Sequence, residues 1–182
     1  MIGGRAVISV SGQSQYSDDI KKRYRASACG PVTISVIMNY WFKNAYPLHA
    51  NDLYKKLGTT PIGLFRFMLV RRLRRILGPD WSVKSSNRIH EVIDELDSVH
   101  PVAAKFDKYL TFRFFKKPLY VYHWVVLTGY EIENGEIYLF FHDNGAPRRD
   151  SKFQRAAFSR HASVLRFALI TPKRTLRLRQ DS

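Results

Sequence analysis

Apolar residues recur at helical spacing from about residue 30 onward. Pro31 fits the first turn of a helix, where its missing N–H group costs nothing. Ile34, Ile37 and Trp41 then follow the i, i+3, i+7 spacing of one buried face. The pattern predicts a central helix and places Cys29 at its N-terminal edge.

A second amphipathic helix is predicted from Thr60-Pro61 to Leu77, with Gly78-Pro79 as its stop signal. Five arginines lie between its apolar positions: Arg66, Arg71, Arg72, Arg74 and Arg75. This basic helix over residues 61–77 suits a surface that meets an anionic partner. Compensation of the helix dipole by arginines in the last turns explains the same pattern equally well.

The remaining pattern predicts mostly helices first and antiparallel strands afterwards. Shorter helices are expected over residues 51–57 and 88–96. Strands are expected over residues 6–10, 81–84, 101–106, 122–131, 136–142 and 163–171. Asn134-Gly135 is a strong hairpin turn between two of these strands. The order indicates an α+β fold in a single domain, residues 1–182.

The strand over residues 122–131 carries a histidine near its start. Both of its faces are apolar, so the strand is expected to be buried with His123 at its edge. The hairpin returns the chain to the side of His123, where Asp143 or Asn144 can accept the imidazole N–H and fix its tautomer. We prefer Asp143 as the orienting group, because alternation places its neighbour His142 on the other face.

Charge widens the range of possible partners. Thirty Lys plus Arg against fifteen Asp plus Glu give a net charge of +15 and a pI near 10.1. Such a basic protein favours anionic partners, and a solvated surface gives the same composition. Phe112 to Lys117 mixes aromatic and basic residues, which suits either single-stranded nucleic acid or the rim of a substrate cleft. Arg148, Arg149 and residues 173–179 are expected to be solvated charge.

Other classes are excluded by what the sequence lacks. One cysteine permits no intramolecular disulfide and no zinc site built on several thiolates. Cys29 is therefore inert packing, a reactive thiol or a nucleophile. No apolar run reaches the roughly 18 residues that span a bilayer, and residues 1–15 lack the apolar stretch of a secretory signal. A cytoplasmic protein is expected, or a secreted one if a signal was removed.

Cys29, His123 and Asp143 together fit nucleophilic catalysis. Cysteine chemistry needs a thiolate, a base within hydrogen-bond reach and a third group that orients the base. A helix N-terminus favours the thiolate through its free N–H groups and its dipole. The same N–H groups can stabilise an oxyanion.

Four segments in this order resemble a known family: Ala28-Cys29-Gly30-Pro31-Val32-Thr33, His100 to Ala104, His123 to Tyr130, and Asp143-Asn144-Gly145. They resemble the nucleophile helix, the preceding strand, the histidine strand and the final turn of papain-like cysteine peptidases. The family is the bacteriocin-processing (double-glycine leader) type, in a stand-alone form. The resemblance covers roughly residues 23–144.

The resemblance implies a papain-like α+β fold, in which an N-terminal helical half packs its nucleophile helix on an antiparallel sheet that carries the histidine. It implies that Cys29 attacks a peptide or amide and forms an acyl-thioester. His123 would shuttle the proton and Asp143 would orient His123. No metal or organic cofactor is implied.

The chain departs from the family in three places. Arg23 stands six residues before the nucleophile, where the family has a glutamine that completes the oxyanion hole. Arg23 itself, Gln13 or Gln15 would take that role, or the site is altered. Asp143-Asn144 replaces the Asp-Pro turn, so Asn144 stays open as an orienter. No transporter segment is present, and leader removal during export is not expected.

Two alternatives to a thiol hydrolase remain. The first is a catalytically weak relative that acts as a basic binding module for an anionic partner, which the Arg23 departure and the charge favour. The second is a transglutaminase or acyltransferase, which uses the same Cys-His-Asp logic and needs an amine acceptor.

Overall fold

The computed structural model describes residues 4–43, 48–107 and 122–173. Its helices are η1 (Arg25–Ser27, a 3-10 helix), α1 (Cys29–Phe42), α2 (Ala50–Lys56), α3 (Arg66–Leu77), α4 (Ile89–Asp97) and α5 (Phe158–His161). Its strands are β1 (Arg5–Val7), β2 (Trp81–Ser86), β3 (Val102–Asp107), β4 (Tyr122–Glu133), β5 (Glu136–Asp143), β6 (Lys152–Ala157) and β7 (Leu165–Pro172). The predicted α+β class is confirmed.

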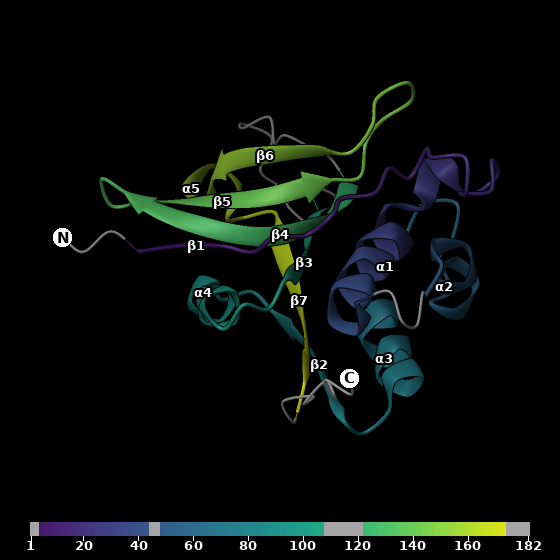
Figure 1. Cartoon of the computed structure of the whole chain (residues 1–182), viewed down its shortest axis with the longest axis horizontal. Helices are drawn as coiled ribbons and strands as arrows, with labels where there is room; N and C mark the ends of the chain where they lie inside the picture. The colour runs from purple at the N-terminus through teal and green to yellow at the C-terminus, as the bar shows by residue number, and fades with distance from the viewer. Residues whose placement is uncertain (1–3, 44–47, 108–121, 174–182) are drawn as a thin grey trace, which may run out of the picture.

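The strands form one antiparallel sheet with β4 near its centre (Figure 1). The order is β2-β7-β3-β4-β5-β6, and β1 also pairs with β4. β3 pairs with Tyr122 to Leu127 of β4, and β1 continues on the same edge opposite Gly129 to Glu131. β5 returns along the other edge through the predicted turn, where Asn134 and Gly135 have positive φ angles of 51° and 80°. The residues at the start of β4 therefore extend past the end of β5.

Alternation along β4 divides the core in two. Trp124 and Val126 face a cluster formed with α1, α2 and α3, whereas Val125 and Leu127 face a second cluster that includes α4. Figure 1 shows α1, α2 and α3 grouped on one side of β3 and β7, with α4 on the other. Both faces of β4 are thus buried, as the sequence predicts.

α1 is the central helix that the apolar spacing predicts. Ten of its 14 residues are buried, including Val32, Ile34, Ile37 and Met38. It packs on β4 and begins at Cys29, so the nucleophile candidate lies where the helix meets the sheet.

The predicted helix over residues 61–77 is wrong at its start, since α3 begins only at Arg66. Thr60 and Gly63 instead form a tight turn, in which the Gly63 N–H donates to the Thr60 carbonyl at 2.8 Å. Gly63 has a φ of 110°, which no helix accommodates. The Leu64 carbonyl is also unavailable to a helix, because it accepts from side chains of β4, as described below.

The sequence pattern does not predict β6 and α5. β6 is an edge strand with no buried residue, so it carries little of the apolar alternation that marks a half-buried strand. The aromatic and basic stretch Phe112 to Lys117 and most of the basic tail over residues 173–179 lie outside the described residues. Among the helices that are described, none is long and apolar enough to cross a membrane.

Gly129 tests the packing of β1 against β4. A Cβ atom at this position would collide with the Ala6 carbonyl oxygen and lie 3.0 Å from the Val7 Cα. Gly129→Ala should therefore destabilise the fold by about 1–3 kcal/mol in urea unfolding. Gly4→Ala is the control, because its nearest neighbour is the end of a side chain, the Tyr130 hydroxyl at 3.1 Å, and not backbone at 2.3 Å. Equal stability of Gly129→Ala and the wild type would contradict this packing.

Candidate active site

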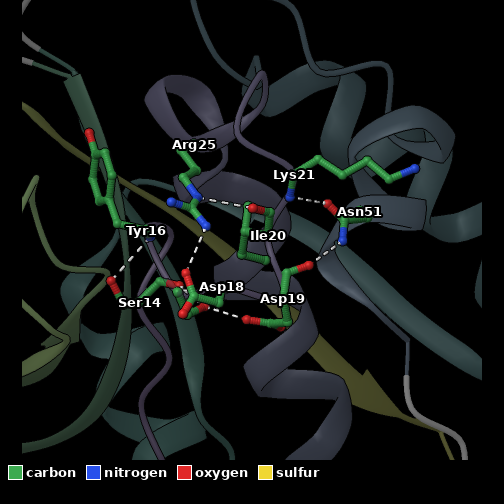
Figure 2. Close-up of polar contacts among 9 residues, drawn as sticks. Ser14, Tyr16, Asp18, Asp19, Ile20, Lys21, Arg25 and Asn51 are labelled. Carbon is green, nitrogen blue, oxygen red and sulfur yellow. Dashed lines mark hydrogen bonds and ion pairs between the residues drawn. The ribbon is translucent and has the colours of Figure 1, made fainter.

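The segment before α1 is fixed by polar contacts with α2 and within itself (Figure 2). Asn51 of α2 donates its amide N–H to the Asp19 carbonyl at 2.6 Å and accepts the Lys21 N–H at 3.0 Å. Arg25 donates to the Ile20 carbonyl at 3.0 Å. These contacts fold the polar loop onto the helical layer and set the path by which the chain enters α1.

Cys29 is the first residue of α1 and is 4% exposed. Burial raises the pKa of its thiol, while the backbone N–H groups of Trp124 and Gly30 act in the opposite direction. The thiol thus lies against the backbone of β4 at the residue that follows His123. The expected position of Cys29 at the N-terminal edge of a buried helix is confirmed.

Trp124 joins the start of α1 to the sheet and is fully buried. Its indole N–H donates to the Leu64 carbonyl at 2.8 Å, and the Tyr122 hydroxyl donates to the same oxygen at 2.9 Å. A Cβ atom at Gly30 would lie 3.1 Å from the Trp124 ring and 2.8 Å from the Leu64 Cβ. Only glycine therefore lets the helix approach this closely.

His123 and Asp143 lie on the other side of the same junction. His123 is 9% exposed and Asp143 is fully buried. Burial lowers the pKa of His123 to about 4; the Asp143 carboxylate opposes this shift and Arg149 adds to it. The imidazole is therefore neutral at pH 7 and can act as a base, with a carboxylate near enough to stabilise its protonated form.

The Asp143 carboxylate is itself held by a set of donors. It accepts the Gly145 N–H at 2.8 Å, the Arg149 guanidinium at 3.0 Å and the side-chain amide of Gln154. The expectation that Arg149 is solvated charge is wrong, because it pairs with Asp143. Nothing in the sequence marks Gln154, since it lies on the unpredicted edge strand β6.

Asn144 follows β5, and its side chain contacts both α1 and β4. Its side-chain amide nitrogen lies 2.9 Å from the Cys29 carbonyl oxygen, 2.8 Å from the Thr33 hydroxyl and 2.8 Å from the Trp124 carbonyl oxygen. His142 pairs with Val126, so alternation puts Asn144 on the face of α1 and Asp143 on the opposite face. The described contacts of Asn144 are thus those of a brace at the start of α1.

The three candidates for the oxyanion hole lie in different places. Arg23 is exposed, and its guanidinium lies over the Tyr24 ring, 5.0 Å from the centroid. Gln13 donates to Asp19 at 2.8 Å. Gln15 is 4% exposed, and its backbone N–H donates to the Asn144 carbonyl at 2.8 Å. Of the three, Gln15 is the residue with a described contact to Asn144, which in turn contacts the Cys29 carbonyl.

The junction has a buried thiol at the start of α1 and, on the other face of β4, a neutral imidazole under the influence of a buried carboxylate. No three His, Cys, Asp or Glu side chains gather as a metal site within the described part of the chain.

The buried His123 should make stability depend on pH. Its pKa is about 4 in the folded chain and 6.5 ordinarily, so the unfolded chain takes up the proton first as the pH falls. Its contribution is complete above pH 6.5 and disappears as the pH falls through 4, which amounts to about 3 kcal/mol between pH 7 and pH 4. Urea unfolding at both pH values measures this loss.

His123→Gln is the comparison for that measurement, because it removes the titrating group. Burial also lowers the pKa of His142 and His161, so both proteins should lose some stability in acid. The loss should be smaller in His123→Gln by about 3 kcal/mol. An equal loss in the two proteins would show that His123 is not held neutral.

Solved peptidase structures share this fold. The peptidase domain of Streptococcus ComA, a bi-functional ABC transporter involved in quorum sensing, is similar with a TM-score of 0.56 and 15% identity, over 92% of this chain and 98% of that one. A C39-like peptidase from Bacillus anthracis gives a TM-score of 0.65 and 11% identity, over 94% and 100% of the two chains. The digestive procathepsin L2 proteinase from the Tenebrio molitor larval midgut gives 0.56 and 14%, over 91% of this chain and 65% of that one.

These similarities establish a papain-like α+β fold, as the resemblance of the motifs implies. No curated protein sequence matches the chain significantly. The sequence profile of the Peptidase C39-like family matches residues 7–167, which is most of the 182-residue chain. The chain therefore belongs to the Peptidase C39-like family of papain-like cysteine peptidases.

Proposed function

We propose that the protein is a thiol-dependent hydrolase that cleaves a peptide or amide bond through an acyl-thioester on Cys29. The observation that carries the proposal is the junction of α1 and β4. The Cys29 thiol meets the backbone of β4 at Trp124, and the preceding residue of that strand is His123, a neutral imidazole whose protonated form the buried Asp143 favours. We take residues 1–182 as a single domain, which the profile match over residues 7–167 supports.

In the first half-reaction His123 takes the proton of the Cys29 thiol while the sulfur attacks the carbonyl carbon of the substrate. We assign the oxyanion to the backbone N–H groups at the start of α1 and to the side-chain amide of Gln15, which also donates to the Arg25 carbonyl at 2.6 Å. His123 then gives the proton to the leaving amine, and the acyl group stays on the sulfur. Asp143 orients the imidazole and stabilises its charged form.

In the second half-reaction His123 removes a proton from water, which attacks the thioester. The carboxylic acid leaves, and the proton returns to the thiolate. An amine in place of water would give a new amide by the same steps, which is the acyltransferase alternative.

Amidolysis of a panel of peptidyl aminomethylcoumarin substrates tests the assignment. Cys29→Ala should abolish release of the fluorophore. His123→Ala should lower kcat/KM by about 10²–10⁴-fold, because the general base is lost. Asp143→Asn should lower kcat/KM less and keep the fold.

His142→Ala is the matched control, since His142 lies on the face of β5 opposite Asp143. A control as inactive as His123→Ala would contradict the roles of His123 and Asp143.

Dansylcadaverine added to the same reactions separates hydrolysis from acyl transfer. A hydrolase should release the acid, with little acyl-dansylcadaverine in the product mixture. Predominant formation of that amide would assign the chain to the acyltransferase class, with the roles of Cys29 and His123 unchanged.

We also propose a second role, binding of a phosphate-bearing polyanion in a basic groove. A cavity of about 530 Å³ lies where the end of α3 meets β2, and its lining includes Arg74, Arg75, Lys84 and Lys173. Trp81, also in the lining, packs on Trp41 near the C-terminal end of α1. A helix of 14 residues is about 20 Å long, so the groove lies about that far from Cys29 and can be occupied during catalysis.

Calorimetric titration with inorganic polyphosphate tests the groove. Arg75→Ala with Lys84→Ala should weaken binding at least about tenfold, because two charge-assisted contacts are lost. Lys21→Ala with Lys22→Ala removes the same charge from another exposed site and should bind like the wild type. Equal losses in the two double variants would show diffuse attraction by the net charge and contradict a groove.

A further inference from the structure

A charged residue lies in the middle of the most buried strand. All six residues of β3 are buried, and one of them is Lys105, which is 2% exposed. Sequence periodicity predicts only a buried strand at this position. An ammonium group removed from water is costly unless it is paired, so its position calls for a physical cause.

Asp107 is the partner of this ammonium. The Lys105 Nζ lies 2.6 Å from the Asp107 Oδ2, and the two side chains are 3% and 7% exposed. The residues are two positions apart on one strand, so they share a face. A buried ion pair of this kind contributes little net stability to the fold, so stability alone does not explain why the pair is present.

Aromatic rings surround the ammonium on the same face. Nζ lies 4.2 Å from the ring centroid of Tyr122, 5.7 Å from that of Phe65 and 6.0 Å from that of Trp124. The sheet register sets Lys105 opposite Trp124 and Asp107 opposite Tyr122. Since both β4 rings are fixed by hydrogen bonds to the Leu64 carbonyl, the cation has a rigid setting.

This aromatic cage adjoins the nucleophile. Trp124 forms one wall of the cage, and the same residue contacts the Cys29 thiol through its backbone N–H. Lys105 lowers the pKa of Cys29 against the larger effect of burial. Cys29 and Asp107 in turn help to raise the pKa of Tyr122, after burial. The Lys105 ammonium, the Cys29 thiol and the Tyr122 phenol are thus linked by their electrostatic effects.

His123 does not supply a positive charge to the thiolate in the resting protein. Its pKa is about 4, so its ring is neutral at pH 7. The other charged groups around the junction are Asp143 of β5, Arg149 after it, Arg66 of α3 and Arg166 of β7, and Arg66 is coupled to Asp107 and Arg166. Among these charged groups, Lys105 is the one that lowers the pKa of Cys29.

We propose that Lys105 is an electrostatic partner of the nucleophile, a buried ammonium held by Asp107 and an aromatic cage so that it stabilises the Cys29 thiolate. The inference rests on the proposed role of Cys29. It divides two tasks between two residues: Lys105 supplies the positive charge that stabilises the thiolate, and His123 moves the proton.

Alkylation by iodoacetamide between pH 5 and pH 10 tests the role of Lys105, because the chain has only one cysteine to react. Lys105→Met with Asp107→Asn removes the pair without leaving a buried charge, so its fold should survive. Its alkylation profile should move to higher pH, and a rise of one in the pKa of the thiol should slow alkylation at pH 7 about tenfold. Lys105→Arg keeps the charge and should keep the wild-type profile.

Superimposable profiles of the double variant and the wild type, both unfolding cooperatively in urea, would overturn the inference. So would a displacement of the Lys105→Arg profile as large as that of the double variant, because packing would then be the cause. His123→Ala, assayed by amidolysis in parallel, separates the two claims. If it loses activity while the Lys105 profiles do not move, only the role of Lys105 fails; if it stays active, the proposed function fails as well.

Discussion

The contact between Trp124 and the first turn of α1 is the interaction on which the rest of the structure depends. The indole donates to the Leu64 carbonyl, the backbone carbonyl accepts from Asn144, and the backbone N–H meets the Cys29 thiol. One fully buried residue thus joins the helical layer, the sheet and the proposed nucleophile. Both hydrophobic clusters include residues of β4, so a shift of this strand would disturb both clusters and move the imidazole relative to the thiol.

Burial sets the protonation states of the side chains at this junction. It disfavours the charged forms of both Cys29 and His123, and this leaves the thiol and the imidazole neutral at pH 7. The proposed reaction must separate charge between these two groups, and we assign that task to groups that are already fixed: backbone N–H groups and Lys105 for the sulfur, Asp143 for the imidazole. Preorganised charges of this kind cost no rearrangement when the reaction occurs.

The sequence predicts the parts of this site that depend on local pattern. The apolar spacing after Cys29 gives α1, and Asn134-Gly135 gives the hairpin that returns Asp143 to the side of His123. Alternation along β5 could also have placed Asn144 on the face of α1, away from His123. The position of Lys105 against the Trp124 ring could not be predicted, because it depends on the pairing of β3 with β4 across a long stretch of chain. The late start of α3 likewise follows from tertiary hydrogen bonds to Leu64, which override the start signal at Pro61.

Mass spectrometry of the intact protein, quenched in acid during turnover of a benzyloxycarbonyl-glycine p-nitrophenyl ester, tests the central claim most directly. The account predicts an added acyl group on the peptide that contains Cys29, removable by hydroxylamine as a thioester is, and much slower to form in His123→Ala. Acylation confined to lysines, or formation of the Cys29 adduct at the same rate without His123, would contradict the assignment of Cys29 and His123 as nucleophile and base.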